Sequence, residues 1–170
     1  IEDGIKNYQY LDRLSAMYLE HGIELHRRQP GFLTGTNIPP SIAIIVAILD
    51  LLLAAAQGVK NYGLEMGETL HLIQDAAAVK ACKDLCQEYL AIKGYEQVFT
   101  PITLLHWMGA WPQDEAQAAS LVSYGGTLAA ISGATSVTTK TLHEAFGIPT
   151  PQINADGLRM TRMAIYLARN

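Results

Sequence analysis

The segment AAAQGVKNYGL (residues 54–64) ends an apolar helical run, passes through Gly58 and enters a short strand candidate. The same order occurs three more times, with Gly22, Gly94 and Gly133 each placed between a helical pattern and a strand pattern. Glycine readily adopts the left-handed conformation that ends many helices. The segment therefore predicts one unit of a repeated α/β series.

Four short segments have the composition of strands, and helical patterns lie before, between and after them. The strand candidates are residues 23–26, 59–64, 98–103 and 135–139, and the helical candidates are residues 3–20, 40–57, 71–93, 114–131 and 152–168. The strand starts recur roughly every 37 residues, a period typical of repeated supersecondary units. Strands that alternate with helices predict a parallel sheet with right-handed crossovers.

Two architectures are built from such units, the closed eight-stranded barrel and the open doubly wound sheet. The even spacing and the absence of GxGxxG after any strand favour the (β/α)8 TIM-barrel family. Four strands and five helices make about half of such a barrel. The first helix has no strand before it, and the last helix ends with the chain. We therefore expect residues 1–170 to be one partial barrel domain, cut from a longer protein and without a second domain.

The helix boundaries carry further signals. Pro39-Pro40 and Pro112 stand at or just before helix starts, and Asp114 is a candidate N-cap. Residues 40–57 are apolar on almost every face, so we expect a buried helix that is covered on several sides. Their apolar run is shorter than the ~20 residues of a membrane span and contains Asp50.

Composition narrows the class of partner and compartment. Twelve basic and sixteen acidic residues give a net charge of −4, and no basic stripe occurs, so nucleic acid and anionic membrane surfaces are poor partners. Cys82 and Cys86 are four residues apart and share one helix face. We interpret them as reduced thiols in the core or at an interface, which fits a cytoplasmic protein; a disulfide is the weaker interpretation.

In a barrel, chemistry takes place in the loops that follow the strands, at the edge called here the mouth. The mouth loops are residues 27–37, 65–70, 104–113 and 140–150. The first has two glycines and two arginines, which suit a carboxylate or phosphate, or simply a solvated loop. The third contains Trp107 and Trp111, which suit a flat ligand or packing beneath a neighbouring loop. In the fourth, Lys140 and Glu144 could hold ribose hydroxyls or developing charge, or form a structural ion pair.

Motifs for other chemistries are missing. His143-Glu144 matches half of HExxH, but Gly147 stands in place of the second histidine. The five histidines lack zinc-site spacing, and neither a GxSxG elbow nor a P-loop is present. The sequence predicts no metal site.

Longer motifs resemble those of one known family. They are LTGT (33–36) with PP (39–40), AAQGVKN (55–61), QD (74–75), HWMG (106–109), PQDE (112–115), GAT (133–135) and KTLHEAFGIPT (140–150). Together they resemble the epsilon subunit of glutamate mutase, also called methylaspartate mutase. The resemblance covers nearly all 170 residues, and WMGAWPQDE (107–115) and KTLHEAFGIPT are long enough to be specific.

The resemblance implies a TIM barrel that holds the adenosyl side of adenosylcobalamin (coenzyme B12). It implies an isomerase that interconverts L-glutamate and threo-3-methylaspartate by radical carbon-skeleton rearrangement after cleavage of the cobalt–carbon bond. The implied partners are a small cobalamin-binding subunit, whose DxHxxG motif does not occur here, and a second large subunit in a heterotetramer.

Individual positions take family roles by the same resemblance. Lys140 and Glu144 match contacts to the adenosyl ribose, and Thr34, Met108 and Gly109 match contacts near the upper face of the corrin. Gly67 lies in another matching mouth loop. His106 is a candidate for catalysis, although it stands where the family usually has glutamine.

Three further positions depart from the family pattern. Leu105 replaces a histidine that contacts substrate, Pro30 replaces an aromatic residue beside the cofactor, and Ser136 replaces a lysine. By the resemblance, the arginines that bind the substrate carboxylates fall upstream of residue 1. We therefore expect residues 1–170 alone to bind glutamate weakly. The alternatives are a related mutase with a changed substrate, a noncatalytic half-barrel that uses residues 40–57 as an interface, and an unrelated phosphate-binding barrel enzyme.

Overall fold

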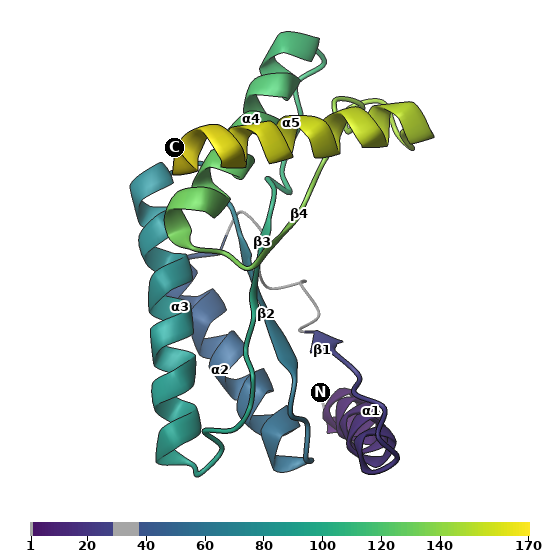
Figure 1. Ribbon diagram of the computed structural model, residues 1–170, viewed down its shortest axis with the longest axis vertical. Coiled ribbons are helices and arrows are strands. Elements are labelled where there is room, and N and C mark those ends of the chain that lie inside the picture. The colour runs from purple at the N-terminus through teal and green to yellow at the C-terminus, as the bar shows by residue number, and fades with distance from the viewer. Residues whose placement is uncertain (1, 29–37) are drawn as a thin grey trace.

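The computed structural model describes residues 2–28 and 38–170. Within them the elements are α1 (Glu2–Glu20), β1 (Arg27–Arg28), α2 (Pro40–Ala56), β2 (Tyr62–Gly67), α3 (Leu72–Ile92), β3 (Ile102–Leu105), α4 (Glu115–Ser132), β4 (Ser136–Thr138) and α5 (Pro151–Arg169) (Figure 1). This order confirms the predicted alternation of helices and strands. The five helix predictions are correct to within one residue at every end.

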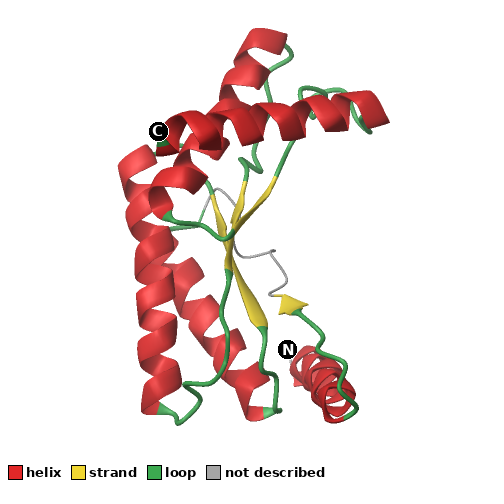
Figure 2. Ribbon diagram, viewed as in Figure 1, coloured by secondary structure: helices red, strands yellow, loops and turns green. Residues whose placement is uncertain are grey.

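The four strands form one parallel sheet in the order β1-β2-β3-β4 (Figure 2). Register partners such as Glu65, Thr103 and Ser136 share a face, which is called here the inner face. Leu64 and Leu104 lie on the opposite face and belong to the hydrophobic core, which α2, α3 and α4 cover. The apolar core and the polar inner face therefore lie on opposite sides of the sheet.

The sheet is curled toward its inner face. Arg28 on β1 donates from Nη2 to Thr138 Oγ1 on β4 at 2.7 Å, although β2 and β3 lie between these strands. In a flat sheet, first and fourth strands would be about 14 Å apart, farther than one arginine side chain reaches. The four strands therefore form a half-barrel curve.

Strand boundaries differ from the prediction. Residues 23–26 are not a strand; the ladder begins at Arg27 and Arg28, which pair with Tyr62 and Gly63. β2 and β3 begin three and four residues later than predicted, and β4 occupies the middle of its predicted range. The predicted mouth loops at 27–37, 65–70 and 104–113 therefore start too early, because their first residues still belong to the sheet.

The predicted helix ends are confirmed. Gly22, Gly58, Gly94 and Gly133 all have positive φ, between 72° and 96°. Asp114 caps α4 by accepting from the Gln117 N–H at 2.9 Å. These local signals explain why helices were located more accurately than strands.

Packing confirms one prediction about the core and corrects another. Cys82 and Cys86 are free thiols without exposed surface, which agrees with the predicted reduced thiols and places them in the core. Helix α2 is buried on one side only, because a row of its apolar side chains is exposed: Ile42, Ile45, Leu49 and Leu53. Among the described residues, no helix has both the length and the hydropathy needed to cross a bilayer.

Candidate functional site

Three of the four predicted mouth loops meet at one edge of the sheet. Gly67 at the end of β2 pairs with Leu105 at the end of β3, which pairs with Thr138 at the end of β4. The loops that follow these residues are therefore neighbours. The first predicted loop lies outside the described residues from position 29 onward, and with it the expected contact Thr34 and the substituted position Pro30.

Lys140 and Glu144 form an ion pair in the loop after β4. Lys140 Nζ is 2.7 Å from Glu144 Oε2, and the Thr141 N–H donates to Glu144 Oε1 at 3.4 Å. Their side chains are 25% and 21% exposed, so both are partly shielded and still accessible. A fixed donor beside a fixed acceptor can bind a pair of hydroxyl groups.

The loop after β3 is folded around Trp107. Its indole N–H donates to the Ala110 carbonyl, and the Trp111 indole donates to the Trp107 carbonyl, at 3.0 and 2.9 Å. A Cβ on Gly109 would lie 2.4 Å from the Trp107 ring, so only glycine fits there. Met108 is half exposed on this closed loop. The loop thus presents a fixed apolar surface at the mouth.

The inner face carries an ion pair and two of the substituted positions. Arg28 pairs with Glu65, which is buried, and burial raises the pKa of this carboxyl while Arg28 opposes the rise. Ser136 bonds to Thr103 through their hydroxyl groups at 2.7 Å. Leu105 shares this face because it is two residues beyond Thr103 on β3.

His106 follows Leu105 and points to the opposite, helix-covered side of the sheet. It is 1% exposed, and its Nδ1 accepts from the Lys140 N–H at 3.3 Å. Burial lowers its pKa to about 4, so its imidazole is neutral near pH 7. Glu68 lies beside it without exposed surface, and its Oε2 accepts from the Trp107 N–H at 3.0 Å. The candidate catalytic histidine is thus placed behind the mouth.

The arginines proposed to bind phosphate already have carboxylate partners. Arg27 donates from Nε to Asp12 Oδ1 at 2.7 Å on the helix side, and Arg28 pairs with Glu65 on the inner face. Both charges are therefore compensated within the chain. This arrangement gives no support to the phosphate-enzyme alternative.

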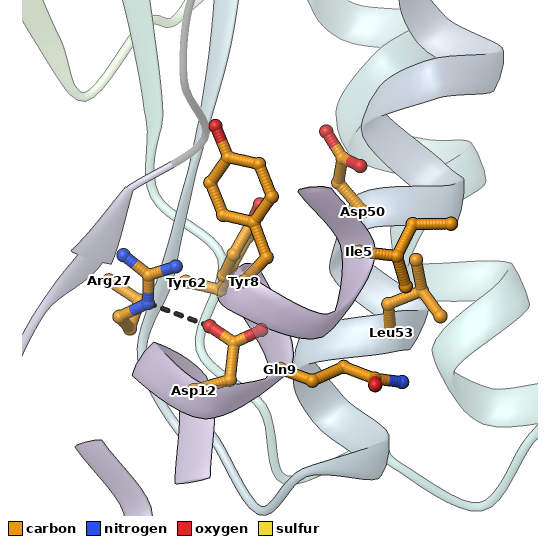
Figure 3. A pocket seen from close by; sticks show the side chains of 8 residues that line it. All are labelled: Ile5, Tyr8, Gln9, Asp12, Arg27, Asp50, Leu53 and Tyr62. Carbon is orange, nitrogen blue, oxygen red and sulfur yellow. Dashed lines mark hydrogen bonds and ion pairs between the residues drawn. The ribbon is translucent and has the colours of Figure 1, made fainter. Parts of the chain in front are cut away.

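A separate cavity of about 60 Å³ lies between α1, α2 and the start of β2. Figure 3 shows the Arg27–Asp12 pair on one side of it and Asp50 of α2 on the other. Burial, and then the charge of Asp12, raises the pKa of Asp50. The cavity has room for about two water molecules and lies on the helix side, so it is not part of the mouth.

Comparison with known proteins identifies the family. The family model described as Methylaspartate mutase E chain matches residues 1–170. The chain belongs to this family. Glutamate mutase epsilon subunits of Treponema denticola and Yersinia enterocolitica are 44% and 41% identical to it over 99% and 100% of its length, respectively. That of Halobacterium salinarum is 44% identical over 95% of the chain.

The methylaspartate mutase E chain relatives are much longer than this chain. The matched residues make up 35% of the Treponema denticola and Yersinia enterocolitica proteins and 33% of the Halobacterium salinarum protein. The chain therefore spans about a third of the length of the curated relatives that it matches.

Sequence reasoning placed several residues of this mutase-family chain at the mouth and missed others. The structure brings Gly67, Met108, Gly109, Lys140 and Glu144 to the predicted edge of the sheet. It also adds two buried glutamates, Glu65 and Glu68, which were not singled out. The sequence signal that could have identified both residues is a carboxylate inside or directly after a buried strand. A buried carboxylate needs a charged or hydrogen-bonding partner, so its position indicates a network.

Proposed function

We propose that this chain is a portion of the epsilon subunit of an adenosylcobalamin-dependent glutamate mutase. The reaction is the interconversion of L-glutamate and threo-3-methylaspartate, an isomerisation of the carbon skeleton. Family membership supports the proposal, and the Lys140–Glu144 pair at the mouth is the observation that carries it. The activity is that of the longer protein, of which these residues supply one part.

The curled sheet supports a TIM-barrel architecture for that protein. Four parallel strands in chain order, with helices in every connection, match half of a (β/α)8 barrel. We propose that residues 1–170 form a partial catalytic domain and that further strands close the barrel. The inner face, with Glu65 and Thr103, then lines the barrel interior.

The mouth residues fit the adenosyl side of the cofactor. The Lys140 ammonium donates hydrogen bonds and the Glu144 carboxylate accepts them. This arrangement suits two ribose hydroxyl groups, because each hydroxyl can both donate and accept a hydrogen bond. Half-exposed Met108 offers an apolar contact for a flat macrocycle. Gly109 has no side chain, so the loop can pack closely against the Trp107 ring at this point. Gly67, beside Leu105, completes this edge, and Thr34 is assigned a contact by resemblance.

The protein's role is to bind, orient and shield. When bound, adenosylcobalamin supplies a cobalt–carbon bond whose cleavage starts radical chemistry. Lys140 and Glu144 hold the ribose, and their mutual ion pair fixes both side chains before the cofactor arrives. Two indole hydrogen bonds hold the Trp107 loop closed, and we propose that this loop shields one side of the bound cofactor from water.

The proposed assembly includes two further components. A small cobalamin-binding subunit covers the mouth, and a second large subunit completes a heterotetramer. The exposed apolar row of α2, centred on Ile45 and Leu49, requires cover from outside the described residues. The buried free thiols Cys82 and Cys86 are consistent with the cytoplasm as compartment.

The direct test uses the full natural polypeptide with a small subunit and adenosylcobalamin. Incubation with L-glutamate should yield 3-methylaspartate, measured by proton NMR. Omission of the cofactor is the control and should abolish product. A complex that binds the cofactor and converts no amino acid would contradict the proposal.

A mutase with a changed substrate is the second candidate. The observation that favours it is the position of Leu105 and Ser136, which both lie on the inner face where the family carries a histidine and a lysine. Leu105 stands where the resemblance implies a histidine that contacts substrate, and Ser136 replaces a lysine on the same face. A panel of amino acids offered to the same complex would identify this case, because one other than glutamate would be turned over faster.

A further inference from the structure

Beyond the ends of the strands, two side chains continue the hydrogen-bond ladder of the sheet. The Glu68 N–H donates to the Leu105 carbonyl at 3.1 Å, and the His106 N–H donates to the Thr138 carbonyl at 3.3 Å. In a regular parallel ladder, the same two residues would next accept with their own carbonyls, from positions 107 and 140. Here their side chains accept instead.

Each side chain thus ties its own strand to the loop that follows the next strand. Glu68 Oε2 accepts from the Trp107 N–H at 3.0 Å, and His106 Nδ1 accepts from the Lys140 N–H at 3.3 Å. The first bond links the end of β2 to the tryptophan loop. The second links the end of β3 to the residue that carries the mouth ammonium group.

The remaining polar atoms of the two side chains face the same place. A Cβ on Gly125 of α4 would lie 2.4 Å from Glu68 Oε1 and 2.5 Å from His106 Nε2. Among the described residues, neither atom has a hydrogen-bond partner, and the two atoms are not bonded to each other; both residues are at least 99% buried. The absent side chain of Gly125 is what leaves room for the pair.

The hydrogen positions make the two atoms complementary. Because the Lys140 N–H donates to Nδ1, the neutral imidazole carries its hydrogen on Nε2. Oε1 of Glu68 is then an acceptor that borders the same space as the Nε2–H donor. This remains so when the carboxyl is protonated on Oε2, since Oε1 is then a carbonyl oxygen. Burial favours the protonated carboxyl by raising the pKa of Glu68 to about 8.

We propose that Glu68 and His106 are positioning residues, a buried pair beneath α4 that fixes the Trp107 loop and Lys140 relative to each other. The pair acts through Lys140 and does not contact substrate. Its consequence for cofactor binding rests on the function proposed above. Its structural part, the two side-chain-to-backbone bonds and the imidazole tautomer, stands independently of that function.

Glutamine separates the two roles because it has one acceptor oxygen and one donor amide. At position 106 its oxygen can accept from the Lys140 N–H and its amide can present a donor toward Glu68, so His106→Gln preserves the observed bond and the donor. At position 68 its single oxygen can accept from the Trp107 N–H, and its amide then places a second donor opposite the donor of His106. His106→Leu removes both polar functions at similar volume.

The test is amide hydrogen–deuterium exchange on the full natural polypeptide without cofactor. In His106→Leu, the Lys140 amide should exchange at least about tenfold faster, as expected when a buried hydrogen bond is lost. His106→Gln and the surface control Lys80→Gln should match the native rate. Unchanged exchange at Lys140 in a folded His106→Leu protein would overturn the proposal.

Two further readouts keep the outcome decisive. If His106→Leu does not fold, the nitrogen-15 shifts of His106 in the native protein decide: hydrogen on Nε2 supports the pair, and hydrogen on Nδ1 overturns it. In the reconstituted enzyme, His106→Leu should raise the half-saturation concentration of adenosylcobalamin more than it lowers kcat, and His106→Gln should restore it. If the amide exchange and the imidazole tautomer are as expected but the reconstituted enzyme converts no substrate, the proposed mutase function is refuted and the proposed role of Glu68 and His106 is not.

Discussion

Lys140 Nζ lies 2.7 Å from Glu144 Oε2, and Lys80 Nζ lies 2.9 Å from Asp84 on α3, with the same four-residue spacing. The two pairs differ in shielding. Side-chain exposure is 25% and 21% for the first pair, and 74% and 58% for the second. Only the first pair lies at the carboxyl edge of the sheet, so the exposed pair on α3 is a matched control for it.

Loss of either mouth charge should weaken cofactor binding. In the full natural polypeptide with its small subunit, Lys140→Ala or Glu144→Ala should raise the half-saturation concentration of adenosylcobalamin by about 10- to 100-fold, as expected for a charge-assisted hydrogen bond. Titration of turnover with cofactor measures this. Lys80→Ala should leave the curve unchanged. Native behaviour of both mouth variants would remove these residues from the site.

The Glu68–His106 pair should give stability a definite pH dependence. Burial raises the pKa of Glu68 from 4.5 to about 8, so between these values the folded state holds a proton that the unfolded state releases. The contribution of Glu68 to the free energy of unfolding therefore falls as the pH rises. Burial lowers the pKa of His106 from 6.5 to about 4, so stability from the imidazole rises with pH between these values.

The two effects oppose each other below pH 6.5, and only the Glu68 effect remains between pH 6.5 and 8. In that window the native protein should lose up to about 1.4 kcal/mol of stability per pH unit relative to Glu68→Gln. Urea unfolding of both proteins at several pH values checks this. Parallel stability curves for the two proteins would show that Glu68 does not titrate there.

A methyl group at position 125 should force the buried pair apart. Gly125→Ala should destabilise the protein by about 1–3 kcal/mol, because its Cβ would meet Glu68 and His106. Gly4→Ala is the control, since no atom lies within 4 Å of its added Cβ and alanine favours helix α1 by about 0.5–1 kcal/mol. Equal effects of the two substitutions would show that the space beside Gly125 is not filled as described.

The substituted inner-face positions should control substrate choice. The double variant Leu105→His with Ser136→Lys restores the residues typical of the family. If the native protein prefers another amino acid, kcat/KM for glutamate should rise about tenfold or more in the variant, as expected for regained polar contacts. Competition between glutamate and the preferred substrate measures the change. A native enzyme already selective for glutamate would show instead that these positions tolerate leucine and serine.

Local signals predicted the helices and their ends well. Glycine after each of the first four helices and a capping aspartate at 114 act through the nearest backbone groups, so sequence alone is sufficient. Strand limits depended on contacts between strands. Glu65 was expected in a loop, yet it lies inside β2, because Arg28 from another strand compensates its charge.

The places of the candidate residues in the fold were predicted, and the contacts among them were not. Lys140 and Glu144 are one turn apart, so their proximity follows from spacing. Glu68 and His106 are 38 positions apart, and only the register of β2 with β3 brings them together. Their side chains also face away from the mouth. The sequence prediction considered only the mouth loops as candidate sites and therefore missed this pair.

The most direct test of the central claim is a crystal structure of the full natural polypeptide with its small subunit and adenosylcobalamin. We expect Lys140 Nζ and Glu144 Oε2 each within hydrogen-bond distance of a ribose hydroxyl, at the edge formed by Gly67, Leu105 and Thr138. A bound cofactor that contacts neither residue, or that lies away from this edge, would contradict it.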